Sequence, residues 1–545
     1  MQLSDVADAR PMAAPPWRLA AAAAFAIPFV VLTAWTVAVA AHASVVVNGE
    51  RLFYLDDTQM VAMRYGRNLA AGEGLVWNAG ERVEGYSNPA WVLVMAAVHA
   101  AGVPEPVASL AVKGVAWLLA CTVLLFAARL RERIAERDGW ADVVVMVVLV
   151  LHADVVYWAA NGFETPLLTA LLLWLLLRVI DESVSGGVRP TTMLAAGGLA
   201  VVRSDAHLLV AGVVIAALVL SPRRAQTARL APLALVVPAV HLAARLAYYG
   251  DWLPNTFYLR MWAVPDLWLD GLRYVKRFGR EHLVIAALAL AAAASLRGDR
   301  RVWALFAACA AVAAHAVAVG GDAFEHHRFI APAVPLIGVL AVLTVDTWTR
   351  SRAALRVGGL GLVVATAAIS GGTLSRWPVD AMRSWRGKPW QGAAIGRLMR
   401  QQTSARTTVA AIGGGALGYF SHRTMFDFTG RTDPAIARLP ARPGADAAAR
   451  KFDVERTLAR RPDFVVLGVT HEAAELGPAM FALLNVVLER DLVPAIAASA
   501  TFQSEYREQP VPLEPLLARS AVYVRRDSAE RSGVSAWRLD LRDFR

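Results

Sequence analysis

Residues 89–102 read PAWVLVMAAVHAAG, and this stretch decides the topology of the chain. It is apolar throughout, but it is shorter than the ~20 residues that an α-helix needs to cross a bilayer. If it crossed, every later loop would change sides, and four arginine-rich loops would face outward against the positive-inside rule. We therefore expect residues 89–102 to lie along the outer surface of a membrane, with the N-terminus in the cytoplasm.

The arginines behind this assignment lie in short loops between apolar runs, as expected for cytoplasmic loops. They are Arg129, Arg131, Arg133 and Arg137, then Arg223, Arg224 and Arg229, then Arg297, Arg300 and Arg301, then Arg350, Arg352 and Arg356. Because these loops account for much of the net charge of +11, we expect no nucleic-acid partner. The opposite, outer face then receives residues 43–106, 160–164, 203–206, 248–281, 320–328 and everything after 375.

The composition indicates a membrane protein, since 57% of the 545 residues are hydrophobic and only 18% are charged. We predict a polytopic α-helical membrane protein with about eleven transmembrane helices in residues 1–374, the first of them uncleaved. The predicted spans are 18–42, 107–128, 140–159, 165–181, 190–203, 206–221, 229–247, 282–296, 301–319, 329–346 and 353–374. Cys121 and Cys309 lie inside apolar runs and indicate neither a disulfide framework nor a metal site.

Residues 375–545 have the charge density of a soluble protein and are predicted to form a soluble, extracytoplasmic α/β domain. Strand-like runs occur at 407–412, 463–468 and 520–525, with helical stretches between them. Residues 413–418 (GGGALG) fit the G-x-G-x-x-G pattern, but a lone match is weak, and we interpret it as a tight strand-to-helix turn. Earlier in the chain, residues 266–281 predict an amphipathic helix at the membrane surface.

The first outer loop, residues 43–106, carries the adjacent carboxylates Asp56 and Asp57. Neighbouring carboxylates raise one another's pKa, and a raised pKa suits a general base. The alternative interpretation is a solvated loop in which one of the two caps a helix.

Ionisable residues at other outer turns are further candidates. Glu164 lies at the mouth of the bundle, and Arg203 with Asp205 forms either a structural ion pair or part of a site. A guanidinium binds phosphate oxygens well, so Arg328 is a candidate phosphate ligand. The same loop could hold a metal ion, although the spacing does not indicate one; its candidate ligands are Asp322, Glu325, His326 and His327.

These segments, taken in order, resemble the family of arabinofuranosyltransferase B and its relatives named polytopic flagellar motor control proteins. The longest matching segment is NAGERVEGYSNP at 78–89. The others are Asp56-Asp57, Arg67-Asn68-Leu69, Gly72 to Gly74, GFET at 162–165, RSD at 203–205, LPNTFY at 253–258, GGD at 320–322, RF at 328–329 and DFTGRTD at 427–433. The last of these lacks the Leu that we would expect after its Gly.

The resemblance implies a C-type glycosyltransferase (GT-C) fold in a bacterial plasma membrane, with a catalytic carboxylate in the first outer loop. It also implies a polyprenyl-phosphate sugar donor, such as decaprenyl-phosphoryl-arabinofuranose, and inverting transfer to a cell-envelope glycan acceptor. Asp57 or Asp56 would be the base, and no cofactor or metal is indicated. The residues expected to bind substrate are Arg67, Asn78, Glu81, Glu84, Tyr86, Asn88, Glu164, Arg203, Asp205, Asn255, Tyr258, Asp322, His326, His327, Arg328, Asp427 and Asp433.

Two alternatives stay open. The chain could be a non-catalytic membrane scaffold, because a fold does not fix a function. It could also be an enzyme that uses another lipid-linked sugar, such as mannose. A scaffold would have no need for Asp, Glu, Asn and Arg to gather on one side of the membrane. Residue types alone do not distinguish arabinose from mannose as the donor sugar.

Overall fold

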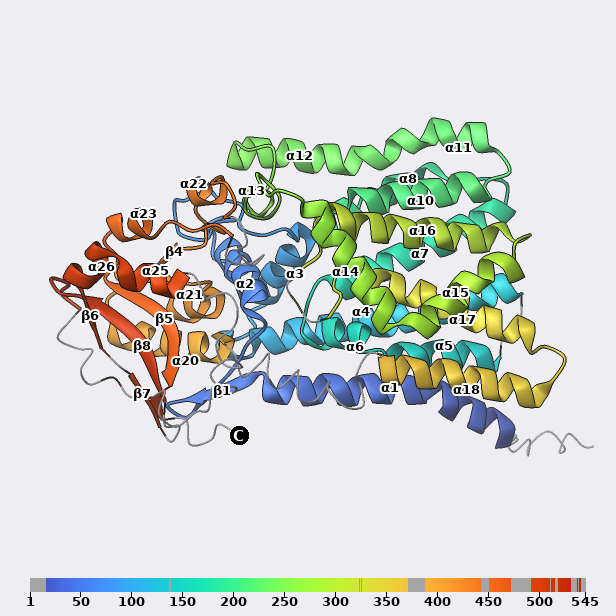
Figure 1. Cartoon of the computed structure of the whole chain (residues 1–545), viewed down its shortest axis with the longest axis horizontal. Coiled ribbons are helices and arrows are strands. Elements are labelled where there is room, and N and C mark those ends of the chain that lie inside the picture. Colours follow the sequence, from blue (N-terminus) through green and yellow to red (C-terminus); the bar gives the residue numbers. More distant parts are fainter. Residues whose placement is uncertain are drawn as a thin grey trace, which may run out of the picture.

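The computed structural model describes residues 16–136, 139–322, 324, 326–370, 388–442, 450–471, 492–509, 511–514, 518–530, 537 and 539–540. Helices run side by side over most of its length, and a β-sheet with its own helices lies beyond one end of them (Figure 1). The predicted boundary at 374/375 lies outside the described residues.

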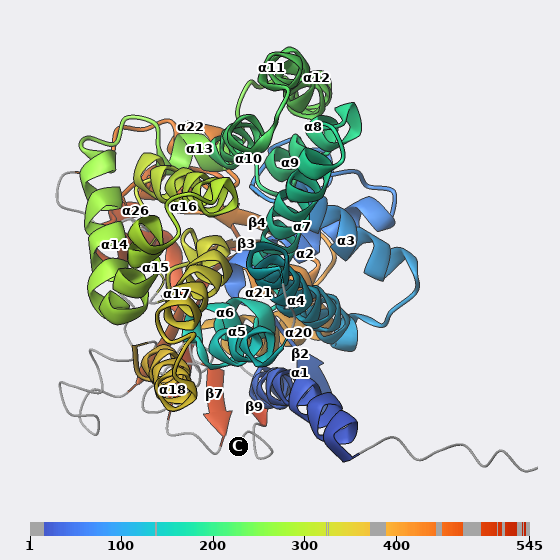
Figure 2. The same cartoon turned by 90° about the vertical axis from the view of Figure 1, so that its right-hand side faces the viewer.

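Five helical segments of the described chain are long and apolar enough to cross a membrane. They are Ala24–His42 within α1 (Pro16–His42), Glu105–Ala135 (α4), Arg224–Tyr249 (α11, η1 and α12), Arg300–Ala318 (α16) and Ala331–Trp348 (η2 and α17). Figure 2 looks along these helices, with α4 and α17 in the interior and α1, α11 and α14 at the rim. A multi-pass helical membrane protein, as predicted, is the architecture that these segments support.

Two further spans are broken in the middle. Trp140–Leu151 (α5) and Ala153–Ala160 (α6) meet at 67°, and Leu267–Glu281 (α14) and Leu283–Ser295 (α15) meet at 95°. Counting each bent pair as one span gives up to seven in the described residues, against about eleven predicted. The remaining predicted spans are helical, but they are shorter or more charged: Thr165–Val184 (α7), Pro190–Ala196 (α8), Leu199–Val202 (α9), His207–Leu220 (α10) and Ala353–Ser370 (α18).

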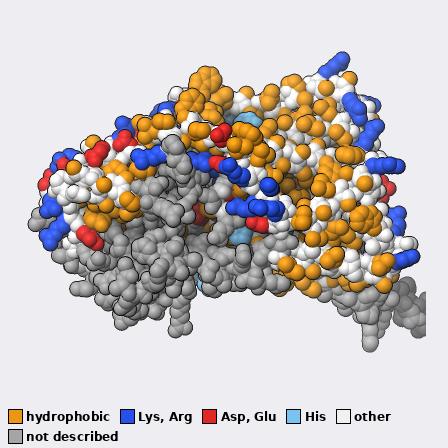
Figure 3. Space-filling view, viewed as in Figure 1, with side chains coloured by type: hydrophobic (Ala, Val, Ile, Leu, Met, Phe, Trp, Pro, Cys, Tyr) orange, Lys and Arg blue, Asp and Glu red, His pale blue; other side chains and the backbone are white. Residues whose placement is uncertain are grey.

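The arginine-rich loops meet at the end of the bundle far from the sheet. Lys and Arg side chains gather along this end in Figure 3. Its exposed arginines include Arg129, Arg133, Arg223, Arg224, Arg297, Arg300, Arg350 and Arg352. Arg131 differs, because it is buried and contacts Asp142 at 3.1 Å and Asp346 at 2.9 Å. Arg137 lies outside the described residues.

The first outer loop forms the other end of the bundle. After the hairpin of Ser44–Val47 (β1) and Glu50–Phe53 (β2) come α2 (Asp57–Ala70) and α3 (Pro89–Ala100). Helix α3 covers most of the stretch that decides the topology, and its twelve residues span only about 18 Å, too short to cross a bilayer. It packs closely on α2, since a Cβ at Gly66 would lie 2.8 Å from the backbone nitrogen of Ala96.

The C-terminal part is built on a mixed sheet of order β4-β3-β5-β8-β7-β9, in which β7 is Val511–Glu514 and β9 is Leu539–Asp540. Strand β6 (Tyr506–Glu508) pairs with β8. Strands β3 (Thr408–Ala411), β4 (Thr424–Asp427) and β5 (Phe464–His471) run parallel, and β8 (Ala518–Arg525) is antiparallel to β5. All three predicted strands are therefore confirmed.

Helices α20 (Lys388–Gln402) and α21 (Gly415–Ser421) lie between this sheet and α2 (Figure 1). One hydrophobic core continues from the first outer loop into the C-terminal part, because Tyr54, Trp91, Trp390 and Phe464 belong to the same buried cluster. This continuous packing fixes the position of the start of α2.

Candidate active site

Asp56 caps helix α2 at its N-terminus. Its Oδ1 accepts a hydrogen bond from the backbone N–H of Thr58 at 2.9 Å, as expected for a helix cap. Burial raises the pKa of the Asp56 carboxyl, and the neighbouring Asp57 adds to this, although the bond from Thr58 opposes it. A half-buried carboxylate with a raised pKa is suited to accept a proton.

Asp57, one residue further on, is held by the C-terminal part of the chain. Its Oδ1 accepts a hydrogen bond from the N–H of Ala416 in α21 at 2.9 Å. The glycines before Ala416 permit this approach, because a Cβ at Gly415 would lie 2.0 Å from the carbonyl oxygen of Asp57. Gly413 and Gly414 adopt positive φ angles of +73° and +76° between β3 and α21. The predicted strand-to-helix turn is confirmed, and Asp57 occupies the space in front of it.

One turn after Asp56, Gln59 begins a buried network that runs into the bundle. Its Nε2 donates to Glu164 Oε2 at 3.2 Å, and Asn88 Nδ2 donates to the same oxygen at 3.1 Å. Arg203 Nη1 donates to Glu164 Oε1 at 2.5 Å, and the same guanidinium makes two bonds to Asp205, at 3.0 and 2.7 Å. The first outer loop is thereby linked to residues from two other outer turns.

Glu164 stays ionised in this network. Its burial would raise its pKa, but the positive charges of Arg203 and Arg328 outweigh burial and lower it. The pKa of Asp205 is likewise lowered, by Arg203 against the effect of burial. Both carboxylates are therefore stable partners for the arginines at neutral pH.

Arg260 and Arg328 extend the positive charge beyond Arg203. All three guanidinium groups lie over the ring of Phe329, with Arg203 at 4.7 Å, Arg328 at 4.9 Å and Arg260 at 5.3 Å from its centroid. Arg328 Nε also lies 3.2 Å from Asp322 Oδ2.

Two groups of this cluster have shifted pKa values that bear on its charge. Burial lowers the pKa of Arg260 to about 10, with a further contribution from Arg328, so that this arginine stays charged at neutral pH. Burial raises the pKa of Asp322, despite the nearby arginines. A protonated Asp322 would neutralise the arginines less than an ionised one.

Several predicted substrate-binding residues instead join the first outer loop to the C-terminal part. Asn78 pairs with the backbone of strand β4, accepting from Met425 N and donating to Met425 O, both at 2.9 Å. It also donates to Glu81 at 3.0 Å. Arg67 Nη1 donates to the carbonyl of Tyr419 at 2.5 Å. These bonds position the loop.

Glu84 and Tyr86 connect the loop to helix α12. Glu84 pairs with Arg245 at 2.6 Å, and the hydroxyl of Tyr86 lies 3.0 Å from that of Tyr249. Burial raises the pKa of Glu84, although Arg245 opposes it. In the segment at 78–89, several predicted residues therefore bond within the chain: Asn78, Glu84, Tyr86 and Asn88.

The remaining predicted residues order the loop after β4. Asn255 Nδ2 donates to the carbonyls of Gly430 and Arg431 at 2.8 and 2.7 Å. Asp427 accepts from backbone N–H groups of the same loop, and Asp433 caps the short helix α22 (Pro434–Ala437). Tyr258 donates to Asp251 at 2.6 Å.

The three candidate metal ligands of the 320–328 loop that the structure describes separate. Asp322 faces Arg328, whereas His326 and His327 contact Asp154 on α6, each at 3.2 Å. Glu325 lies outside the described residues. The histidines therefore belong to a different cluster from the arginines.

The sequence interpretation missed Gln59, Asp154, Arg245 and Arg260. Asp154 carried a usable signal, because it is an ionisable residue inside an apolar run. Gln59 follows Asp56 by three residues and so shares its face of the helix. Arg245 and Arg260 had no local signal, since their partners lie 161 and 61 residues away in the chain.

Comparison with known proteins gives sequence relatives of one kind. The terminal β-(1→2)-arabinofuranosyltransferase of Mycobacterium tuberculosis is 29% identical over 252 residues, which cover 44% of this chain and 39% of the relative. The protein of the same name from Corynebacterium glutamicum is 26% identical over 335 residues, covering 54% and 48%. The chain thus spans less than half the length of the curated relatives it matches. The expected resemblance to arabinofuranosyltransferases is confirmed.

The C-terminal part, over residues 381–521, matches a family described as a domain of unknown function (DUF8728). Among solved structures, ArnT from Cupriavidus metallidurans bound to undecaprenyl phosphate is similar with a TM-score of 0.55 at 14% identity, over 84% of this chain and 94% of ArnT. Its apo state gives a TM-score of 0.53 over 93% and 98%. The chain is therefore similar in sequence to terminal arabinofuranosyltransferases and has the fold of the C-type glycosyltransferase ArnT.

Proposed function

We propose that this protein is an inverting membrane glycosyltransferase that moves arabinofuranose from a polyprenyl phosphate to a hydroxyl of a cell-envelope glycan. The names of its sequence relatives support the sugar, and the ArnT fold supports a lipid-phosphate donor. The observation that carries the proposal is the buried path from α2 to the arginines. This path links α2, whose N-cap Asp56 has the raised pKa, through Gln59 and Glu164 to the guanidinium of Arg203.

Asp56 is the base in this proposal, and Asp57 is a positioning residue. The carboxylate of Asp57 accepts a bond from Ala416 N–H and lies against the glycine turn, which holds the carboxylate in place and hinders access to it. Asp56 takes the proton of the acceptor hydroxyl while that oxygen attacks the anomeric carbon. The bond from this carbon to the phosphate oxygen breaks, and the configuration at the carbon inverts.

The leaving lipid phosphate gains negative charge as this bond breaks. Arg328 and Arg260 are placed to stabilise it, and Arg203 holds the cluster in position through Glu164 and Asp205. Preorganised positive charge of this kind is commonly the largest electrostatic contribution to catalysis. The surrounding rings of Trp158, Phe163 and Phe324 keep the guanidinium of Arg328 away from water.

The site faces the outer side of the plasma membrane in this proposal. The arginine-rich end of the bundle would be cytoplasmic by the positive-inside rule, and the site lies at the opposite end. The C-terminal part is then extracytoplasmic, and it would contribute to holding the glycan acceptor because it packs directly against α2.

Sugar transfer by the purified full chain in lipid nanodiscs tests the proposal. Synthetic polyprenyl-phosphoryl-arabinofuranose and polyprenyl-phosphoryl-mannose would be offered separately with an arabinan oligosaccharide acceptor, and products identified by mass spectrometry and NMR of the new anomeric centre. We expect transfer from the arabinofuranosyl donor with inversion. Transfer from the mannosyl donor alone would contradict the sugar, and binding of both donors without transfer would favour the scaffold.

A further inference from the structure

A second buried polar cluster lies where two helices break. His152 separates α5 from α6, and His282 separates α14 from α15. Both side chains are buried, with 1% of their surface exposed. Irregular backbone inside a membrane bundle is tolerated where it builds a binding site, as in the broken helices of transporters.

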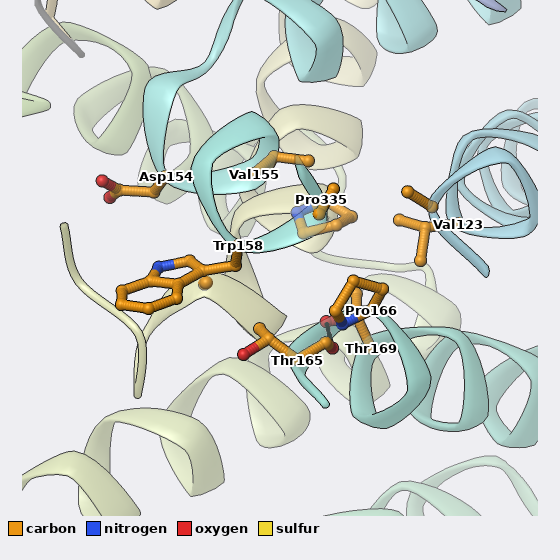
Figure 4. A pocket seen from close by; sticks show the side chains of 11 residues that line it. Val123, Asp154, Val155, Trp158, Thr165, Pro166, Thr169 and Pro335 are labelled. Carbon is orange, nitrogen blue, oxygen red and sulfur yellow. Dashed lines mark hydrogen bonds between the residues drawn. The ribbon is translucent and has the colours of Figure 1, made fainter. Parts of the chain in front are cut away.

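Asp154 brings the two breaks together. Its Oδ2 lies 3.5 Å from His282 Nε2, and one ligand atom from each of His152, Asp154 and His282 lies within 4.8 Å of the others. Figure 4 shows the Asp154 carboxylate pointing away from Val123, Pro166 and Thr169, which line a small apolar pocket of about 20 Å³. Asp154 also lines this pocket, so the cluster adjoins it, with the carboxylate turned away from these three apolar-side residues.

Two nitrogen atoms of the cluster are buried without a hydrogen bond. Within the part of the chain that the structure describes, Nδ1 of His152 and Nδ1 of His282 have no partner. The two rings stack on each other, with centroids 4.5 Å apart and planes at 27°. A buried polar atom without a partner is costly, so these two nitrogens on stacked rings need an explanation.

His327 has a different role, which its partners define. Arg277 Nε donates to His327 Nε2 at 3.3 Å, so this nitrogen is an acceptor and Nδ1 carries the hydrogen. The Nδ1–H then donates to Asp154 Oδ2 at 3.2 Å. Partners of this kind orient the ligands of metal sites.

We propose that His152, Asp154 and His282 bind a divalent cation of the zinc class, with His327 orienting Asp154. Two imidazoles and one carboxylate are a ligand set that Zn²⁺ favours, and three protein ligands leave a fourth position open. Ligand atoms around one tetrahedral ion lie roughly 3.4 Å apart, and those of the cluster lie within 4.8 Å of one another, so they need to approach by at most about 1.4 Å. This inference is independent of the proposed transferase activity, because it concerns metal content.

Elemental analysis of the purified full chain tests the site. We expect about one zinc per chain, removable with EDTA and restored by ZnCl₂. Reloading the metal-free wild type with CoCl₂ should give the visible absorption of Co²⁺ in a tetrahedral nitrogen–oxygen site. This measurement needs no variant. Less than about a tenth of an equivalent after reloading, together with a flat cobalt spectrum, would overturn the proposal.

Variants assign the ion to this cluster. Asp154→Asn keeps the shape of the side chain, and we expect it and His282→Ala each to lower zinc retention at least tenfold after dialysis. The matched control is His241→Ala, because His241 is a half-buried histidine on α12, outside the cluster; it should retain zinc. Size-exclusion profiles would confirm folding, and full zinc retention in both cluster variants would contradict the assignment.

Discussion

The two faces of helix α2 are bonded in different ways. The face toward the bundle carries Asp56 and Gln59, which lead into a network of carboxylates and guanidinium groups. The face toward the C-terminal part is held through backbone atoms, since the buried Arg64 donates to the carbonyls of Trp77, Gly418 and Arg423. Hydrogen bonds to backbone carbonyls hold α2 in position and do not depend on carboxylates. The network of carboxylates and guanidinium groups, by contrast, can respond to a substrate.

This contrast explains why adjacent aspartates receive different roles. Asp57 lies at the face bonded to backbone, and its carboxylate is held by Ala416 N–H. Asp56 lies at the charged face, with a pKa raised by burial. Changes on each face should therefore have different consequences for stability and for sugar transfer.

The largest loss of stability is expected from Arg203→Ala. It leaves Glu164 and Asp205 buried without their partner, which typically costs about 3–5 kcal/mol. Arg273→Ala is the control, because its pair with Asp270 is exposed and should be worth less than about 1 kcal/mol. Chemical unfolding in mixed micelles measures both, and equal stability of the two variants would show that the charge network is not a structural centre.

A smaller effect is expected on the other face, from Gly415→Ala. The new Cβ would meet the Asp57 carbonyl at 2.0 Å and push α21 away from α2, at a cost of about 1–3 kcal/mol and with reduced sugar transfer. Gly279→Ala is the matched control, since Gly279 lies in helix α14 with open space around it. If both variants unfold alike, the close approach of the glycine turn to α2 is unimportant.

The smallest effect is a shift in pH dependence from Asp57→Asn. Transfer needs Asp56 without its proton, so activity should fall as pH falls through the raised pKa of Asp56. The charge of Asp57 contributes to raising that pKa, after burial, so its removal should move the acid limb toward lower pH. A rate profile against pH measures the shift, and movement toward higher pH would argue against Asp56 as the base.

Much of the fold follows from local pattern, and less of the site does. Strands β3, β5 and β8 were predictable because runs of β-branched residues between turn residues mark strands. The break at His152 was not, since the apolar pattern continues across it, whereas the break at His282 coincides with the predicted boundary between the amphipathic helix 266–281 and the span 282–296. The roles of Asp56 and Asp57 could not be separated either, because the partner that distinguishes them, Ala416, lies 359 residues away from Asp57.

The central claim is that Asp56 is the base, and turnover of Asp56→Asn beside Asp57→Asn tests it most directly. Both variants would be assayed in nanodiscs for arabinofuranose transfer from the synthetic donor, with donor binding measured separately. Loss of a general base costs ~10²–10⁴-fold in rate, so we predict this loss for Asp56→Asn and less than about tenfold for Asp57→Asn, with donor bound by both. Wild-type turnover in Asp56→Asn, or the larger loss in Asp57→Asn, would contradict the account.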